Sequence, residues 1–152
     1  MLVVIIPCSM KLYHLIYEQT DKRKVSLAVL TYQGKVLIVK RSKDSYSHAG
    51  KWGFPGGGID SNETAFKAVL RECEEEIGVR PIRVKKLAQN ERITWFVGEL
   101  PYDPEECIDL DYSEHDEWML VDEVSMNEYE MVEGMQEIIV KVLSGEEEDE
   151  VK

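Results

Sequence analysis

The fold of this chain is decided by residues 57–79, which read GGIDSNETAFKAVLRECEEEIGV. Apolar side chains recur here at three- and four-residue spacing, the pattern of an α-helix with one buried face. This apolar stripe consists of Phe66, Val69, Leu70, Cys73 and Ile77. Residues 60–62 offer helix caps, and Glu63 follows Asp60 at the spacing of a capping box. The sequence therefore predicts a helix that begins at Glu63 and ends at Gly78, a residue type that commonly stops helices.

The opposite face of this predicted helix carries carboxylates. Glu72, Glu75 and Glu76 stand at positions i, i+3 and i+4, so they project from one side. Glu74 is rotated away from them. Like charges at this spacing repel by roughly a few tenths of a kcal/mol per pair, which a bound cation would relieve. Mg²⁺ prefers such oxygen ligands, and the glycines at 56–58 let the backbone approach a metal or a phosphate closely.

Outside this segment the chain alternates between strand patterns and turn signals. A helical pattern covers residues 132–143, and residues 52–58 are too rich in glycine to predict regular structure. Gln33-Gly34 predicts the turn of a hairpin. Runs rich in β-branched residues predict strands over residues 25–32, 35–40, 82–88, 92–99 and 117–121. Together these elements imply a single α/β (α+β) domain with a mixed sheet over residues 25–144.

The two ends of the chain lie outside the predicted domain. Residues 1–24 are expected to be an N-terminal extension or an edge strand, since their apolar start lacks the basic region of a signal peptide and is too short to span a membrane. Residues 145–152 are expected to be a disordered acidic tail. The three cysteines lack CxxC spacing, so neither a disulfide framework nor a zinc site is predicted, which favours a reducing cytoplasm.

The charge balance restricts the partners. Thirty acidic and 18 basic residues give the 152-residue chain a formal net charge of -12. Such a charge opposes binding to long nucleic acid or to an anionic membrane. A substrate that carries phosphates would need metal cations to invert the local sign of the site.

The spacing of the polar residues in the opening segment matches a known motif. Gly57, five residues, Glu63, seven residues and then RECEEEIGV resemble the Nudix box, with every polar position and glycine filled. Cys73 stands where the family usually has a larger aliphatic residue, which alters packing more than chemistry. Composition alone would favour a solvated acidic face, whereas the exact spacing favours metal binding. The resemblance implies the Nudix fold, in which a mixed β-sheet is sandwiched between helices.

The resemblance also implies roles for the carboxylates. Glu72, Glu75 and Glu76 would be catalytic metal ligands, and the carbonyl of Gly56 would be a further ligand. The cofactor would be Mg²⁺, with Mn²⁺ as a substitute. The family uses no invariant base, so Glu72 or Glu76 could take the proton of the attacking water. Glu114, on a later segment, is the further candidate for this catalytic role.

Other residues are assigned on the same basis. Arg71 and Glu63 would form an ion pair that holds the helix against the loop. His48 and His115 have no second ligand at metal-binding spacing, so each is expected to be a surface or loop residue. In the run Trp95-Phe96, strand alternation requires one ring to face the core. The residues predicted to contact substrate are Arg41, Trp52, Gly56 and Gly57.

The function that the resemblance implies is hydrolysis of a nucleoside diphosphate linked to another group, X, by a metal-activated water. Small nucleotides are favoured as substrates, such as a nucleoside triphosphate, ADP-ribose or a dinucleoside polyphosphate, and the low isoelectric point argues against long RNA. The alternative is a non-catalytic Nudix-fold module that binds a nucleotide or regulates a partner. The chain is expected to be a monomer or a homodimer.

Overall fold

The structure is a computed structural model that describes residues 23–45 and 47–145. Most of the predicted extension at residues 1–24 and of the predicted tail at residues 145–152 therefore lies outside the described residues. The elements follow the order β1 (Val25–Tyr32), β2 (Lys35–Arg41), β3 (Trp52–Gly53), β4 (Gly56–Gly58), α2 (Ala65–Ile77), β5 (Ile82–Gln89), β6 (Ile93–Glu99), α3 (Pro104–Cys107), β7 (His115–Val121), η1 (Ser125–Glu128) and α4 (Met135–Leu143).

The strands form one mixed sheet. Its main path has the order β3-β2-β1-β6-β5, while β4 pairs with β1 and β7 pairs with β2. β1 and β6 are parallel, and the other pairs are antiparallel. β1 and β2 are paired only next to their turn, where Thr31 faces Val36 and Tyr32 faces Lys35. Beyond the turn β1 pairs with β4 and β2 pairs with β3 and β7, so the two strands of the predicted hairpin separate toward the glycine-rich segment.

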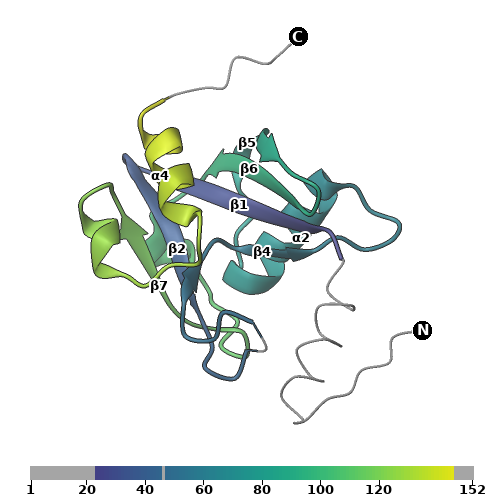
Figure 1. The fold of residues 1–152 in the computed structure, drawn as a ribbon, viewed down its shortest axis with the longest axis horizontal. Coiled ribbons are helices and arrows are strands. Elements are labelled where there is room, and N and C mark those ends of the chain that lie inside the picture. The colour runs from purple at the N-terminus through teal and green to yellow at the C-terminus, as the bar shows by residue number, and fades with distance from the viewer. Residues whose placement is uncertain (1–22, 46, 146–152) are drawn as a thin grey trace, which may run out of the picture.

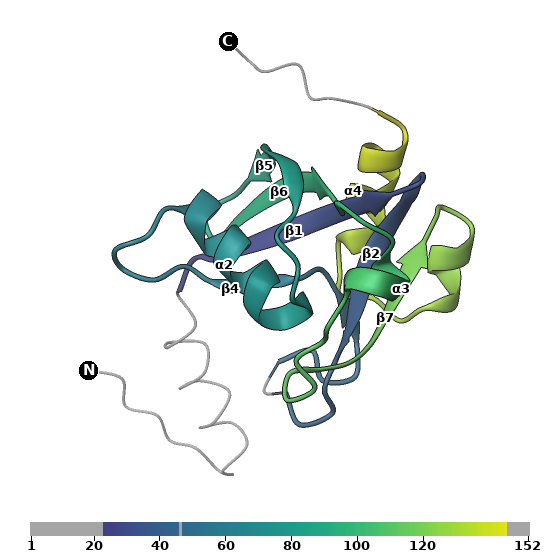
Figure 2. The same cartoon turned by 180° about the vertical axis from the view of Figure 1, so that it is seen from behind.

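Helices cover both faces of the sheet, as the comparison of Figures 1 and 2 shows: α4 lies in front of β1 in one view and α2 lies in front of it in the other. Side chains that alternate along β1 supply both cores. Ala28 and Leu30 pack with the apolar face of α2, whereas Val29 packs with Met135 and Ile139 of α4. The predicted mixed sheet between helices is confirmed. No helix within the described ranges is both long and apolar enough to cross a membrane.

The start of α2 differs from the prediction. Thr64 is the N-cap, and its side chain accepts a hydrogen bond from the Lys67 amide, so the helix begins at Ala65 rather than at Glu63. Glu63 does accept a hydrogen bond from the Asp60 amide at 3.0 Å, but this contact closes the preceding loop. The predicted stop is confirmed, since Gly78 ends α2 with a left-handed backbone at φ 68°.

The glycine-rich segment is more regular than predicted. Gly56, Gly57 and Gly58 form β4 and pair with residues 25–27 of β1, and Trp52 and Gly53 form β3. The prediction of irregular structure over residues 52–58 is therefore wrong. The backbone of β4 is extended because it forms hydrogen bonds with β1, which lies far away in the sequence. Glycine itself has little preference for a strand, so the local sequence does not predict this pairing. α3 and η1 were not predicted because each is only four residues long.

Candidate active site

The three carboxylates on one face of α2 differ in their exposure. The Glu75 side chain is 58% exposed, whereas those of Glu72 and Glu76 are 13% and 6% exposed. Glu76 is buried because the segment that leads into β7 covers it. The Asp111 amide donates a hydrogen bond to the Glu76 carbonyl, and His115, the first residue of β7, contacts the Glu76 carboxylate. The predicted cluster is therefore a partly buried site that faces β4, and not a solvated helix face.

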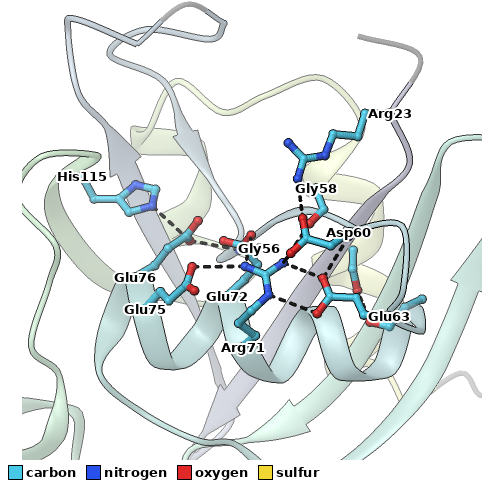
Figure 3. A network of polar contacts seen from close by, with 12 residues as sticks. Arg23, Gly56, Gly58, Asp60, Glu63, Arg71, Glu72, Glu75, Glu76 and His115 are labelled. Carbon is cyan, nitrogen blue, oxygen red and sulfur yellow. Dashed lines mark hydrogen bonds and ion pairs between the residues drawn. The ribbon is translucent and has the colours of Figure 1, made fainter. Parts of the chain in front are cut away.

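Arg71 organises the carboxylates around it (Figure 3). Its Nη2 donates to Glu63 Oε1 at 2.6 Å and its Nε donates to Glu63 Oε2 at 3.1 Å, which is a bidentate pair. Nη1 donates to Glu72 at 2.9 Å and to Glu75 at 3.2 Å. Nη2 also donates to the carbonyl of Gly58 at 3.0 Å. The implied ion pair of Arg71 and Glu63 is thus present, and it joins α2 to the loop that follows β4.

The surroundings shift the pKa values of two carboxyls in opposite directions. Hydrogen bonds from Arg71 and from the Asp60 amide lower the pKa of Glu63 to about 2. Burial, followed by the negative charge of Glu76, raises the pKa of Glu72 to about 7. Arg71 opposes this rise but does not cancel it. The positive charge of Arg71 therefore does not fully offset the burial of Glu72 and its repulsion by Glu76, and a divalent cation would supply further positive charge.

The pKa of Glu63 leads to a pH-dependent stability. Its folded-state pKa of about 2 lies below the ordinary value of 4.5, so ionised Glu63 contributes stability that is present above pH 4.5 and is lost as the pH falls toward 2. In Glu63→Gln this contribution is absent at every pH. Denaturant unfolding of both proteins between pH 2 and 7 should show the stability difference to be largest near neutrality and to shrink in acid. A difference that does not change with pH would contradict the ionic role of Glu63.

The glycines of β4 leave room for these carboxylates. The Gly56 amide donates to Glu76 Oε2 at 3.1 Å. A Cβ at Gly57 would lie 2.6 Å from the carboxyl carbon of Glu72, and a Cβ at Gly56, where φ is 147°, would lie 2.2 Å from the carbonyl oxygen of Ser26. The glycines are therefore required for the close approach of β4 to β1 and to α2.

A third segment reaches the same place from the start of β7. Glu114, the predicted additional catalytic residue, is exposed, and one ligand atom each from Glu76, Glu114 and His115 lie within 4.8 Å of one another. Although the residue is exposed, partial desolvation of its carboxyl and the charge of Glu76 raise the pKa of Glu114. The structure thus brings Glu114 next to a carboxylate of α2 that lies 38 positions earlier in the sequence.

The position of His115 differs from the prediction. It was expected to be a surface or loop residue, but it is only 3% exposed, and its Nε2 lies 3.1 Å from Glu76 Oε2. It is buried because the first residue of β7 pairs with Arg41 of β2. A single histidine with no partner at a regular spacing gives no local sign of this long-range pairing.

A cavity of 1160 Å³ opens beside β4 and is lined by segments from β1, β5, β6 and α4. Of the residues predicted to contact substrate, Arg41, Gly56 and Gly57 line it. Trp52 does not reach it: its side chain is 6% exposed, and its ring packs edge-on against Tyr129 with the centroids 5.0 Å apart. Trp52 therefore belongs to the core beneath α4 and is not available to stack on a substrate.

The neighbouring aromatic pair divides between the core and the cavity. Phe96 is buried and packs against Phe66 of α2 at 5.9 Å, while Trp95 lines the cavity. The prediction that one of these rings faces the core is confirmed. Arg23 and Arg92 also line the cavity. The sequence did not predict that these two arginines line the cavity, because both lie outside the Nudix box and only the folded sheet brings them close to it.

Comparisons with known proteins agree with this fold. The NUDIX domain model matches residues 21–142. The chain belongs to the NUDIX family, whose members include the Nudix hydrolases. Among solved structures, the NUDIX domain of Shewanella oneidensis NrtR complexed with ADP ribose is 20% identical, with a TM-score of 0.65 over 91% of this chain and 99% of that one. The MutT protein from Methanosarcina mazei Go1 is 23% identical, with a TM-score of 0.63 over 83% of this chain and 95% of that one.

Curated relatives are more similar in sequence but over shorter stretches. RNA pyrophosphohydrolase from Bartonella tribocorum is 33% identical over 91 residues, which are 57% of this chain and 50% of the relative. 8-oxo-dGTP diphosphatase from Proteus vulgaris is 40% identical over 62 residues, which are 39% of this chain and 54% of the relative. The chain spans about half the length of the curated relatives it matches.

Proposed function

We propose that this protein is an Mg²⁺-dependent pyrophosphohydrolase that cleaves a small nucleotide in which a nucleoside diphosphate is linked to another group. The observation that carries this proposal is the pair of carboxylates of Glu72, which is partly buried, and Glu76, which is buried, facing the glycine backbone of β4. A cation would stabilise anionic groups in this position. The cavity is lined not by these carboxylates but by Gly56 and Gly57, which contact them, and it has room for a nucleotide.

The residues fit a hard divalent cation. Glu72, Glu75 and Glu76 would hold Mg²⁺, or Mn²⁺ in its place, through carboxylate oxygens, and the Gly56 carbonyl would add a further oxygen ligand. When bound, the ion would offset the charge of the diphosphate and make an attacking water more acidic. Arg71 would keep Glu72 and Glu75 in place through its two Nη1 hydrogen bonds.

Glu114 is the carboxylate that we assign as general base. It lies beside Glu76 without belonging to α2, so it can approach a water from the opposite side of the site. Its raised pKa, caused by burial and by the Glu76 charge, makes it a better proton acceptor than an ordinary glutamate. The water would lose its proton to the Glu114 carboxylate as its oxygen attacks phosphorus, and the phosphoanhydride bond to the leaving phosphate would break.

The cavity supports a small nucleotide as the substrate. Arg41 lines the same cavity as the glycine strand, where it would meet phosphate, and the half-buried Trp95 ring, which also lines the cavity, would meet a base. The net charge of -12 argues against a long nucleic acid. Because some relatives are named RNA pyrophosphohydrolase, RNA with a 5′-triphosphate is the substrate class against which this proposal must be tested.

A nucleotide panel tests the function. Nucleoside triphosphates, ADP-ribose, dinucleoside polyphosphates and 5′-triphosphorylated RNA are incubated with the protein and Mg²⁺ or Mn²⁺, with EDTA as the control, and the phosphate products are identified. Metal-dependent cleavage of a small nucleotide supports the proposal. Cleavage of the RNA alone would overturn the substrate assignment, and tight binding without phosphate release would establish a non-catalytic module.

We also propose that the protein works in a reducing cytoplasm as a monomer or a homodimer. Of the cysteines in the described ranges, Cys73 and Cys107 are both free thiols. Burial raises the pKa of the Cys73 thiol, which keeps it unreactive in the core of α2. Size-exclusion chromatography with light scattering measures the oligomeric state directly.

A further inference from the structure

The contact between His115 and Glu76 has an unusual geometry. Nε2 of His115 and Oε2 of Glu76 are 3.1 Å apart, and both side chains are almost fully buried. Yet neither ring nitrogen has a hydrogen-bond partner within residues 23–45 and 47–145. Buried polar atoms are rarely left without a partner, and such an exception indicates an absent ion or water. Figure 3 shows the His115 ring directed at the Glu76 carboxylate from the side opposite Arg71.

The separation of these two atoms fits a shared metal ion. Neighbouring ligands of an octahedral ion with bonds of about 2.1 Å are about 3 Å apart. A neutral imidazole coordinates through the lone pair of its unprotonated nitrogen. When that nitrogen is Nε2, it and Glu76 Oε2 are both acceptors, which repel at this distance unless a cation lies between them. The exposed carboxylate of Glu114 lies beside this pair, since its ligand atom is within 4.8 Å of the other two.

We propose that His115 is a direct metal ligand, and that Glu76 and His115 form a mixed nitrogen and oxygen site for a transition-metal ion such as Mn²⁺, with the general base Glu114 beside it. The proposal rests on the proposed function in that Glu76 is shared with the Mg²⁺ ligands assigned above and Glu114 is the general base assigned there. A site of oxygen atoms alone suits Mg²⁺, whereas an imidazole ligand shifts the preference toward transition metals. The protein should therefore bind Mn²⁺ more tightly than Mg²⁺ through this histidine.

Pulsed electron paramagnetic resonance tests this ligand without using activity. One equivalent of Mn²⁺ is added to the 152-residue protein, and electron spin-echo modulation from ¹⁴N is recorded. We expect nitrogen modulation that changes to the ¹⁵N pattern when histidine is isotopically labelled, a comparison that needs no substitution. His115→Gln should lose the modulation, whereas His48→Gln, which alters another histidine, should retain it.

The same variants provide a binding test. Calorimetry should show that His115→Gln reduces the preference for Mn²⁺ over Mg²⁺ on the order of tenfold or more. Loss of a residue that only hydrogen-bonds to a metal ligand already weakens metal binding by about 10- to 100-fold, so loss of a ligand should cost at least as much. Wild-type protein without nitrogen modulation, or modulation that survives in folded His115→Gln, would overturn the proposal. Nucleotide hydrolysis could persist in either case, so this failure is distinguishable from failure of the proposed function.

Discussion

Glu76→Gln is expected to lower kcat at saturating Mg²⁺ by about 10³-fold or more. The change keeps the size of the side chain but removes a charge that is buried beside β4 and within reach of Glu114 and His115. Loss of one preorganised group that stabilises developing charge costs about 10²- to 10³-fold, and loss of a metal ligand adds to this cost. The measurement is steady-state hydrolysis of the nucleotide that the panel identifies, across a series of Mg²⁺ concentrations.

Glu74→Gln is the matched control for this substitution. Glu74 lies on the same helix, but its side chain is 52% exposed and forms an ion pair with Arg80 at 3.5 Å. This variant removes the same charge from the same helix, so general electrostatics predict a similar effect for both. We expect kcat to stay within about twofold of wild type, because exposed pairs contribute little. Equal losses in the two variants, or full activity in Glu76→Gln, would contradict the assignment of the ligand.

Arg71→Lys is expected to destabilise the fold and to impair catalysis together. Lysine keeps the positive charge but cannot reproduce the fork that contacts Glu63, Glu72 and the Gly58 carbonyl at the same time. Hydrogen bonds to charged groups contribute about 1.5–3 kcal/mol, so we expect the free energy of unfolding to fall by about 2 kcal/mol. The kcat/KM should fall at least about tenfold, because Glu72 loses the contact that orients it.

Arg80→Lys provides the control for Arg71→Lys. Arg80 follows the end of α2 and forms an ion pair with Glu74, which lies on the same helix as Arg71. Both side chains of this pair are mostly exposed, at 69% for Arg80 and 52% for Glu74. Urea unfolding should give a change of about 0.5 kcal/mol or less for this variant. If Arg71→Lys has an equally small effect on stability, the network around Arg71 does not hold the loop to α2.

The parts of the fold that the sequence predicted well are those with a local cause. The turn at Gln33-Gly34 has positive φ angles of 49° and 77°, so two adjacent residues determine the hairpin between β1 and β2. The apolar stripe of α2 and the glycine that ends the helix are likewise determined by residues close together in the sequence. The start of α2 was misplaced because several capping residues precede it and only the tertiary position of the loop selects Thr64.

The parts that the sequence did not predict depend on distant segments. β4 is a strand because it pairs with residues 25–27 of β1, and glycine composition opposed that prediction. His115 is buried because β7 pairs with β2, and the Trp52 ring is in the core because Tyr129 covers it. The box therefore predicted the carboxylates on α2, whereas the histidine beside Glu76 and the cavity under α4 required the folded sheet.

Hydrolysis in ¹⁸O-labelled water tests the central claim most directly. Wild-type protein and Glu76→Gln are incubated with Mg²⁺ and a mixture of small nucleotides in this water, and the products are analysed by mass spectrometry. The predicted result is that wild type cleaves a phosphoanhydride and places one ¹⁸O atom in one of the two phosphate-bearing products, while Glu76→Gln leaves the nucleotides intact. Nucleotides that bind to the wild-type protein but are recovered whole and unlabelled would contradict the account.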